Sequence, residues 1–215
     1  MSDVQLRKDV IDELEWDPSV NAAHIGVAVE KGVVTLSGHV ATYAEKIAAE
    51  RAVRRVRGVR AIAEEIEIRL PSAKKTSDDE IAKRAANILD WDSQVPKGAI
   101  EITVHNGWVT LDGAVDWQFQ RRAAEDDVRK LSGVAGVNNR LTINSRPQIP
   151  EIQQRIEEAL RRNAEIEAKG VQVTVSGGTV TLTGTVHDWV EHDAIKNAAW
   201  SAPGVQSVED RLTVI

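Results

Sequence analysis

Gly32-Val33-Val34-Thr35-Leu36-Ser37-Gly38-His39-Val40 carries a pattern that indicates the fold, because it occurs three times in the chain. It returns as Gly107-Trp108-Val109-Thr110-Leu111-Asp112-Gly113-Ala114-Val115 and as Gly178-Thr179-Val180-Thr181-Leu182-Thr183-Gly184-Thr185-Val186. The shared form is G-x-V-T-L-x-G-x-V. Its copies begin 75 residues apart (107 − 32) and then 71 apart (178 − 107). A pattern repeated at this period predicts tandem structural units rather than one large domain.

Each copy of the motif is the second strand of a predicted β-hairpin. The first strands are predicted at 25–29, 100–104 and 171–175, where apolar and polar residues alternate. The turns before the motif contain Asn106-Gly107 and Gly177-Gly178, which are strong signals for a tight hairpin with positive φ at both turn positions. The second glycine of the motif is expected to let the chain leave the strand for the next helix.

A helix is predicted on each side of every hairpin. The leading helix of the first copy spans 4–14, the second copy begins at a Ser77/Glu80 capping box, and the third begins at Pro150-Glu151. The following helices are predicted at 43–56, 117–131 and 188–202. They stop at Gly58, Gly133 and Gly204, each 26 residues after its hairpin glycine. A glycine there fits a left-handed helix terminus.

A last strand closes each unit, over 58–68, 133–143 and 204–214, with the form G-V-x-x-[VI]-x-x-x-[IL]-x-[VI]. The predicted fold is α+β, with three tandem α-β-β-α-β units over residues 1–70, 76–145 and 148–215. Each unit is a three-stranded mixed sheet with two helices on one face. The linkers are short, so neighbouring units are expected to stay close.

The order of these elements and the two-part motif resemble the BON domain, named for bacterial OsmY and nodulation proteins. The resemblance covers essentially the whole chain as three copies. It implies a small α/β sandwich without enzymatic activity or cofactor, from a family associated with osmotic stress and proposed to bind phospholipid membranes. It also implies a structural role for the shared glycines, which are Gly32, Gly38, Gly58, Gly107, Gly113, Gly133, Gly178, Gly184 and Gly204.

Composition narrows the range of partners and compartments. The 215-residue chain has no cysteine, which excludes disulfide and thiolate chemistry, and its net charge is −6. Counted by unit, acidic side chains outnumber basic ones 12 to 10, 11 to 8 and 10 to 6. We therefore expect no nucleic-acid partner, because that binding needs cationic neutralisation of phosphates. No signal peptide or long apolar run is seen, so the expected location is the cytoplasm. Peripheral attachment to the inner membrane is the alternative location.

Catalytic and metal-binding constellations are weak in this sequence. Ser37 and His39 share one strand face, but the other copies replace His39 with Ala114 and Thr185. His187 and His192 lie five residues apart at the start of one helix, which is not the i, i+4 spacing of two ligands. We therefore predict no catalytic residue and no dedicated metal site.

Two groups of side chains are candidates for contact with a lipid or a partner. The first is the cluster Arg51, Arg54, Arg55 and Arg57, which the helix dipole or solvation alone could also explain. The second is the aromatic set Tyr43, Trp117, Trp189 and Trp108, whose bulk either covers small cores and seams or enters a membrane interface. The leading expectation is association with a phospholipid surface. The alternatives are a protein–protein adaptor, including a homo-oligomer, and, below these, a sensor of a small ligand or ion.

Overall fold

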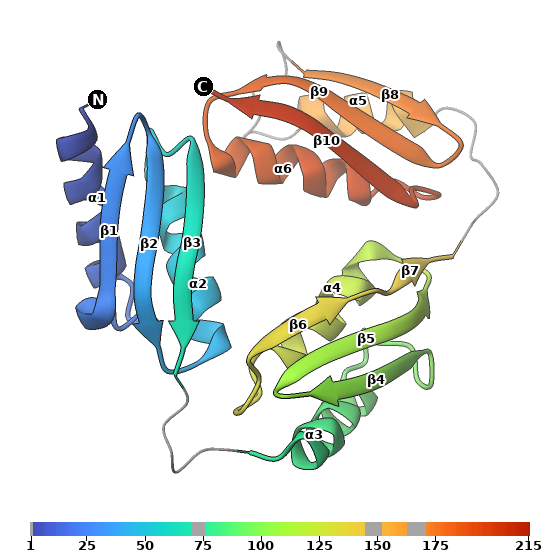
Figure 1. Cartoon of the computed structure of the whole chain (residues 1–215). Coiled ribbons are helices and arrows are strands. Elements are labelled where there is room, and N and C mark those ends of the chain that lie inside the picture. The colour runs from blue at the N-terminus through green and yellow to red at the C-terminus, as the bar shows by residue number, and fades with distance from the viewer. Residues whose placement is uncertain (1, 70–75, 145–151, 163–170) are drawn as a thin grey trace. The chain divides into compact units, whose positions relative to one another are not determined.

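The computed structural model describes residues 2–69, 76–144, 152–162 and 171–215 (Figure 1). It contains three successive units of the predicted α-β-β-α-β type, and the α+β class is confirmed. The first two repeats form one compact unit, Met1–Thr142, and the third forms another, Ile143–Ile215. Most of the predicted linkers and the predicted helix start at Pro150 lie outside the described residues.

The elements follow the sequence repeat. The first repeat holds α1 (Asp3–Trp16), η1 (Ala22–His24), β1 (Ile25–Glu30), β2 (Val33–Val40), α2 (Tyr43–Arg55) and β3 (Ala61–Ile68). The second holds α3 (Asp78–Trp91), β4 (Ile100–His105), β5 (Trp108–Val115), α4 (Gln118–Val128), β6 (Gly136–Asn139) and β7 (Thr142–Ile143). The third holds α5 (Ile152–Arg162), β8 (Val171–Ser176), β9 (Thr179–Val186), α6 (Trp189–Trp200) and β10 (Ser207–Val214).

The motif strand is the central strand of every sheet. The orders are β1-β2-β3, β4-β5-β6 with β7 also on β5, and β10-β9-β8. Each motif strand pairs antiparallel with its hairpin partner and parallel with the strand that follows the second helix. The parallel pairing needs a crossover, and the second helix supplies it.

Both helices of a repeat cover the same face of its sheet (Figure 1). The motif valine and leucine point into that layer and are fully buried, as Val34 and Leu36 are in the first repeat. Small or β-branched side chains of the second helix, such as Ala49 and Val53, meet them. The opposite face of the sheet carries no helix, and its side chains are exposed or half-buried.

The hairpin turns have the conformation that their residues predict. Lys31 and Gly32 have φ angles of 51° and 80°, and Asn106 and Gly107 have 51° and 78°. Positive φ at both positions is the mark of a type I′ turn. The first carboxylate of the leading helix also holds these turns. Asp78 accepts hydrogen bonds from the Asn106 and Gly107 amides, at 2.7 and 2.8 Å.

The second glycine of the motif is required for a different reason from the one that the sequence predicts. Gly38 lies inside β2 with φ of 112°, and a Cβ there would sit 2.0 Å from the carbonyl oxygen of His24. Gly113 repeats this with the carbonyl of Ala99, at 2.2 Å. The glycine therefore permits a close approach of the chain entering the first strand. It does not serve the exit into the second helix.

The last strand of the second repeat is not continuous, which corrects the predicted strand over 133–143. It divides into β6 and β7 at Arg140 and Leu141. The Asn139 side-chain amide donates to the Arg121 carbonyl at 3.1 Å and to Glu125 Oε2 at 2.9 Å, and both acceptors lie on α4. These bonds draw Asn139 toward α4 and bend the strand.

Candidate functional site

Two tryptophans at the ends of the leading helices are the most exposed aromatic side chains among the described residues. Trp16 is the last residue of α1 and is 82% exposed, and Trp91 is the last residue of α3 and is 89% exposed. They occupy the same position, 16 residues before the hairpin glycine (32 − 16 and 107 − 91). The helices bury Leu14 and Leu89, two positions earlier, which turns each indole away from the core.

The predicted arginine cluster lies at the end of α2, beside the end of α1. Arg55 contacts Glu13 at 2.9 Å and Asp17 at 3.0 Å, both on or just after α1. It therefore ties the two helix ends together within one residue of Trp16. Arg54 pairs with Glu50 at 2.7 Å along its own helix, whereas Arg51 and Arg57 are exposed.

Asp17 is a strongly ionised group at this helix end. Hydrogen bonds from the Ser19 hydroxyl, from Arg55 and from the Ser19 amide lower the pKa of Asp17 to about 2. The same interaction raises the pKa of the Arg55 guanidinium. Both groups are therefore charged at every physiological pH. Of the predicted arginines, Arg54 and Arg55 form ion pairs with side chains of the first repeat.

The other predicted aromatic residues occupy two different environments. Tyr43, Trp117 and Trp189 begin the second helices and are half-buried. Tyr43 packs against the core of the second repeat, and this burial raises the pKa of its hydroxyl. Trp108 is 56% exposed on the helix-free face of its sheet, opposite to the buried Val109.

Sequence reasoning left Trp16 and Trp91 out of the candidate set. Their exposure follows from helical spacing, because each lies outside the i, i+3, i+4 stripe that its helix buries. That signal was present in the sequence. The expectation that tryptophans cover cores and seams concealed it. The predicted arginines lie in or just after α2 of the first repeat, whereas Trp108 lies on β5 and Trp117 just before α4 of the second.

A polar contact between the second helix and the last strand recurs in all three repeats. It starts from the residue 14 positions after the hairpin glycine, which is Lys46, Arg121 or His192. Lys46 Nζ contacts Glu64 Oε2 at 2.6 Å and donates to the Ile66 carbonyl at 2.9 Å. Arg121 donates to the Asn139 carbonyl at 3.2 Å. We call these contacts the helix–strand links.

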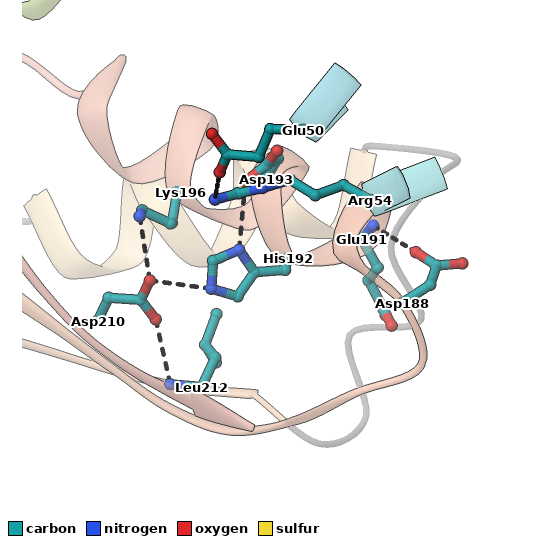
Figure 2. Close-up of polar contacts among 9 residues, drawn as sticks. All are labelled: Glu50, Arg54, Asp188, Glu191, His192, Asp193, Lys196, Asp210 and Leu212. Carbon is teal, nitrogen blue, oxygen red and sulfur yellow. Dashed lines mark hydrogen bonds and ion pairs between the residues drawn. The ribbon is translucent and has the colours of Figure 1, made fainter. Parts of the chain in front are cut away.

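The link of the third repeat is the most buried. His192 is 5% exposed, and its Nε2 lies 2.9 Å from Asp210 Oδ2 on β10 (Figure 2). Its Nδ1 lies 3.2 Å from Asp193 Oδ1. Lys196 Nζ reaches the same oxygen of Asp210 at 3.1 Å, and the Trp189 ring meets the imidazole edge-on at 4.9 Å.

A groove of about 360 Å³ separates α5 from the edge strand β8 in the third repeat. Gln153, Glu157 and Arg161 line its helical side, and Gln172 and Thr174 line the strand. In the first repeat, Arg7 stands at the position of Gln153 (32 − 7 = 178 − 153) and donates to the Val27 carbonyl of the edge strand at 2.8 Å. Gln153 instead donates to Glu157 at 3.0 Å.

The described parts of the chain hold neither a metal-binding cluster nor a membrane-spanning helix. No cluster of three or more His, Cys, Asp or Glu side chains there could hold a metal ion. Among the same residues, no helix has both the length and the apolar character needed to cross a bilayer.

Comparison with known proteins gives three findings. The sequence model described as "BON domain" matches residues 2–69, 77–145 and 149–215. "Osmotically-inducible protein Y" of Escherichia coli K12 is 29% identical over 147 residues, which are 66% of this chain and 72% of that protein. Two solved structures of CdsD, a structural protein of the type III secretion system of Chlamydia trachomatis, align with TM-scores of 0.28 and 0.27.

The two CdsD alignments are 15% and 14% identical. They cover 98% and 100% of this chain, and 92% and 100% of theirs. TM-scores this low do not indicate a shared overall arrangement, so these structures carry no argument about function.

Proposed function

The chain belongs to the BON domain family in all three of its repeats, and from that premise we propose that it is a non-enzymatic protein that binds phospholipid surfaces. The helix-end tryptophans Trp16 and Trp91 make the contact, and the cationic side chains beside them hold the headgroups. Phospholipid vesicles are therefore the first partner to test.

The observation that carries this proposal is the exposure of one aromatic side chain at one position in two repeats. Trp16 and Trp91 are 82% and 89% exposed at the ends of α1 and α3. An indole left in water forgoes the free energy of burial, about 1.5–3 kcal/mol for a large apolar side chain. Its amphipathic ring is favoured at the boundary between acyl chains and headgroups. A membrane surface would therefore stabilise both side chains together.

Basic residues stand beside each helix-end tryptophan. Glu13 and Asp17 hold Arg55 beside Trp16, and Arg57 lies exposed two positions further, so we propose Arg57 as the residue that meets headgroups at this helix end. In the second repeat, Lys130 takes the place of Arg55 (55 − 32 = 130 − 107) just after α4. Guanidinium and ammonium groups attract anionic lipid, at about 1 kcal/mol for each one near the surface. Headgroup attraction and indole insertion would thus act at the same helix ends.

Co-sedimentation with vesicles tests the proposal directly. We expect the full chain to bind vesicles of phosphatidylethanolamine and phosphatidylglycerol, and to bind pure phosphatidylcholine more weakly. The double variant Trp16→Ser/Trp91→Ser should lose at least about tenfold in affinity, since 1.4 kcal/mol corresponds to tenfold. Raising salt from 0.05 to 0.5 M should weaken the wild type further, because screening reduces the cationic contribution.

A matched control distinguishes insertion of the helix-end tryptophans from non-specific adsorption through any exposed tryptophan. Trp108→Ser removes an exposed tryptophan from the sheet face and should leave vesicle binding within about twofold of the wild type. The proposal fails if the wild type does not bind anionic vesicles. It fails equally if the sheet variant and the helix-end variant lose the same affinity.

A role in stress is proposed on a narrower basis. The curated relative is named for osmotic induction. We propose that this chain is likewise produced or needed when osmotic pressure changes. Measuring its abundance before and after a salt upshift in its native host tests this, and an unchanged abundance would contradict it.

A second candidate function is a protein–protein contact through the helix-free sheet faces. It is favoured by Trp108, which lies exposed on that face of the second repeat. We propose Trp108 as the centre of such a contact, including one with a second copy of this chain. Sedimentation equilibrium of the wild type and Trp108→Thr tests the self-assembled form. Equal monomer fractions for both proteins would remove that form of the candidate.

A further inference from the structure

The helix–strand link of the third repeat differs in kind from the other two. Lys46 and Arg121 keep their charge throughout the physiological range, since lysine and arginine titrate far above pH 8. His192 stands at the same position, but an imidazole changes charge between pH 5 and 8. It is also the most enclosed of the three residues, at 5% exposure. In the third repeat, the contact between the second helix and the last strand therefore depends on a side chain that can gain or lose a proton.

The geometry around His192 selects one protonation state. Its Nε2 lies 2.9 Å from Asp210 Oδ2, and its Nδ1 lies 3.2 Å from Asp193 Oδ1. An ionised carboxylate only accepts hydrogen bonds, and a neutral imidazole has one donor and one acceptor nitrogen. Only the imidazolium can donate to both carboxylates at once. In the neutral form, one ring lone pair would face a carboxylate oxygen.

Two carboxylates and one ammonium group face the ring within the third repeat. The charged groups that face His192 within the third repeat are Asp193 and Lys196 from α6 and Asp210 from β10. The buried Glu191 lies one residue away and holds the amide and ring of the exposed His187. The hydrophobic core of the same repeat includes apolar side chains from α5 and β9.

Asp210 remains ionised across this range. Burial opposes its ionisation, but hydrogen bonds from the Leu212 amide and Lys196, with the charges of His192 and Lys196, outweigh burial and lower the pKa of Asp210. The acceptor of the link is therefore constant, and the proton on His192 is the variable.

We propose that the third repeat is a proton-responsive unit in which imidazolium His192 fastens α6 to β10 and neutral His192 releases them. The released proton goes to water, and no other bond changes. The two contacts to carboxylates require the protonated ring, and removing the proton takes a donor from one of them. Acidification therefore tightens this repeat, whereas the links of Lys46 and Arg121 do not respond.

Hydrogen–deuterium exchange of the full chain can be measured for the third repeat separately, from peptides that cover its helix and strand. We compare protection factors, corrected for the intrinsic pH dependence of exchange, for peptides covering 189–200 and 207–214 at pH 5.5 and pH 8. The wild type should lose about tenfold in protection at pH 8, the order of change expected when one charge-assisted hydrogen bond is lost. His192→Arg, which installs the side chain of Arg121, should show equal protection at both values.

His187→Arg is the matched control, because it alters an exposed histidine of the same repeat that is 65% exposed. It should keep the full pH dependence of the wild type. If His192→Arg does not fold, Asp210→Asn removes the negative charge of the acceptor instead and should also flatten the profile. The proposal is overturned if the wild type shows equal protection at both pH values. It is also overturned if a folded variant at 192 or 210 keeps the tenfold change, or if His187→Arg removes it.

Discussion

Arg55 and Asp17 join the end of α2 to the end of α1, through a contact of 3.0 Å between Arg55 Nη2 and Asp17 Oδ2. The carboxylate also holds the hydroxyl of Ser19 at 2.5 Å. This small network stands beside Trp16, so it fixes the base from which the indole projects. The pair is consequently important for both stability and the proposed membrane contact.

We predict that Asp17→Asn destabilises the chain at pH 7 but not at pH 2. The folded-state pKa of Asp17 is lowered from 3.8 to about 2, so its stabilisation is present above 3.8 and is lost as pH falls toward 2. Solvent screening limits the effect at pH 7 to about 1 kcal/mol. Urea unfolding at several pH values measures it.

The control for this prediction is Glu67→Gln. Its partner Arg69 lies 3.1 Å away, but both side chains are more than 60% exposed. An exposed pair contributes about 0–1 kcal/mol, so this variant should match the wild type closely. Equal stability of Asp17→Asn and the wild type at pH 7 would show that the helix-end network is not stabilising.

Gly38→Ala should be among the most damaging small substitutions in the chain. The new Cβ would lie 2.0 Å from the His24 carbonyl oxygen, and φ at this position is 112°. Backbone must move to relieve the clash, and we expect a loss of about 3 kcal/mol or more in unfolding free energy. Thermal and urea unfolding both report it.

Gly98→Ala separates the clash from the backbone strain. Its φ is 70°, yet no atom lies within 4 Å of the added Cβ. It should cost only about 1 kcal/mol, the penalty of a left-handed conformation. Comparable losses in the two variants would mean that the approach of His24 is not what requires a glycine at 38.

The fold could be predicted because the same sequence pattern occurs three times in the chain. Each copy tests the hydrophobic pattern of the others, so positions such as Val34 and Leu36 stand out as core, and the variable positions stand out as surface. The hairpin turn at Asn106-Gly107 could also be predicted, because its conformation depends on these two residues alone. The broken strand in the second repeat was not readable, because the Asn139 amide bonds to a helix 18 residues away in sequence.

The candidate site was predicted less completely, for physical reasons that differ by residue. Arg54 and Arg55 form a basic cluster in sequence, but in the structure Arg54 pairs with Glu50 and Arg55 pairs with Glu13. Glu13 lies on α1, so its contact with Arg55 could not be predicted from the sequence around Arg55. Tyr43 begins a helix as Trp189 does, yet it packs against a neighbouring repeat. His192 could be placed on its helix, but its contact with Asp210 depends on how α6 lies on β10.

Asp78→Ala should weaken the second repeat through its hairpin turn. Asp78 accepts from the amides of Asn106 and Gly107 at 2.7 and 2.8 Å, and the substitution would leave both donors to water. We expect a loss of about 1.5 kcal/mol, because a charged acceptor strengthens each bond. Urea unfolding and exchange of the hairpin amides measure it.

Asp79→Ala is the control for this turn, since Asp79 begins the same helix turn and shares its dipole. Asp79 forms an ion pair with Lys83 at 2.8 Å, where both side chains are more than 70% exposed. It should cost less than about 0.5 kcal/mol. Equal losses from the two aspartates would assign the effect to the helix start and not to the hairpin.

Trp108 and Gly136 should show energetic coupling across neighbouring strands. The two residues are register partners, and a Cβ on Gly136 would meet the Trp108 ring at 2.6 Å. The other repeats pair a smaller residue with a side chain here, Val33 with Ala61 and Thr179 with Ser207. The glycine therefore accommodates the indole.

A double-mutant cycle measures this coupling. In the Trp108→Thr background, Gly136→Ala should stabilise by about 0.5 kcal/mol, because glycine inside a strand is costly. With Trp108 present, the same change should be neutral or destabilising, since the ring must leave the strand surface. We expect a coupling energy of about 1 kcal/mol, within the range for residues in contact. Additive effects would mean that the indole does not rest on Gly136, and the sheet face would then offer no fixed aromatic platform to a partner.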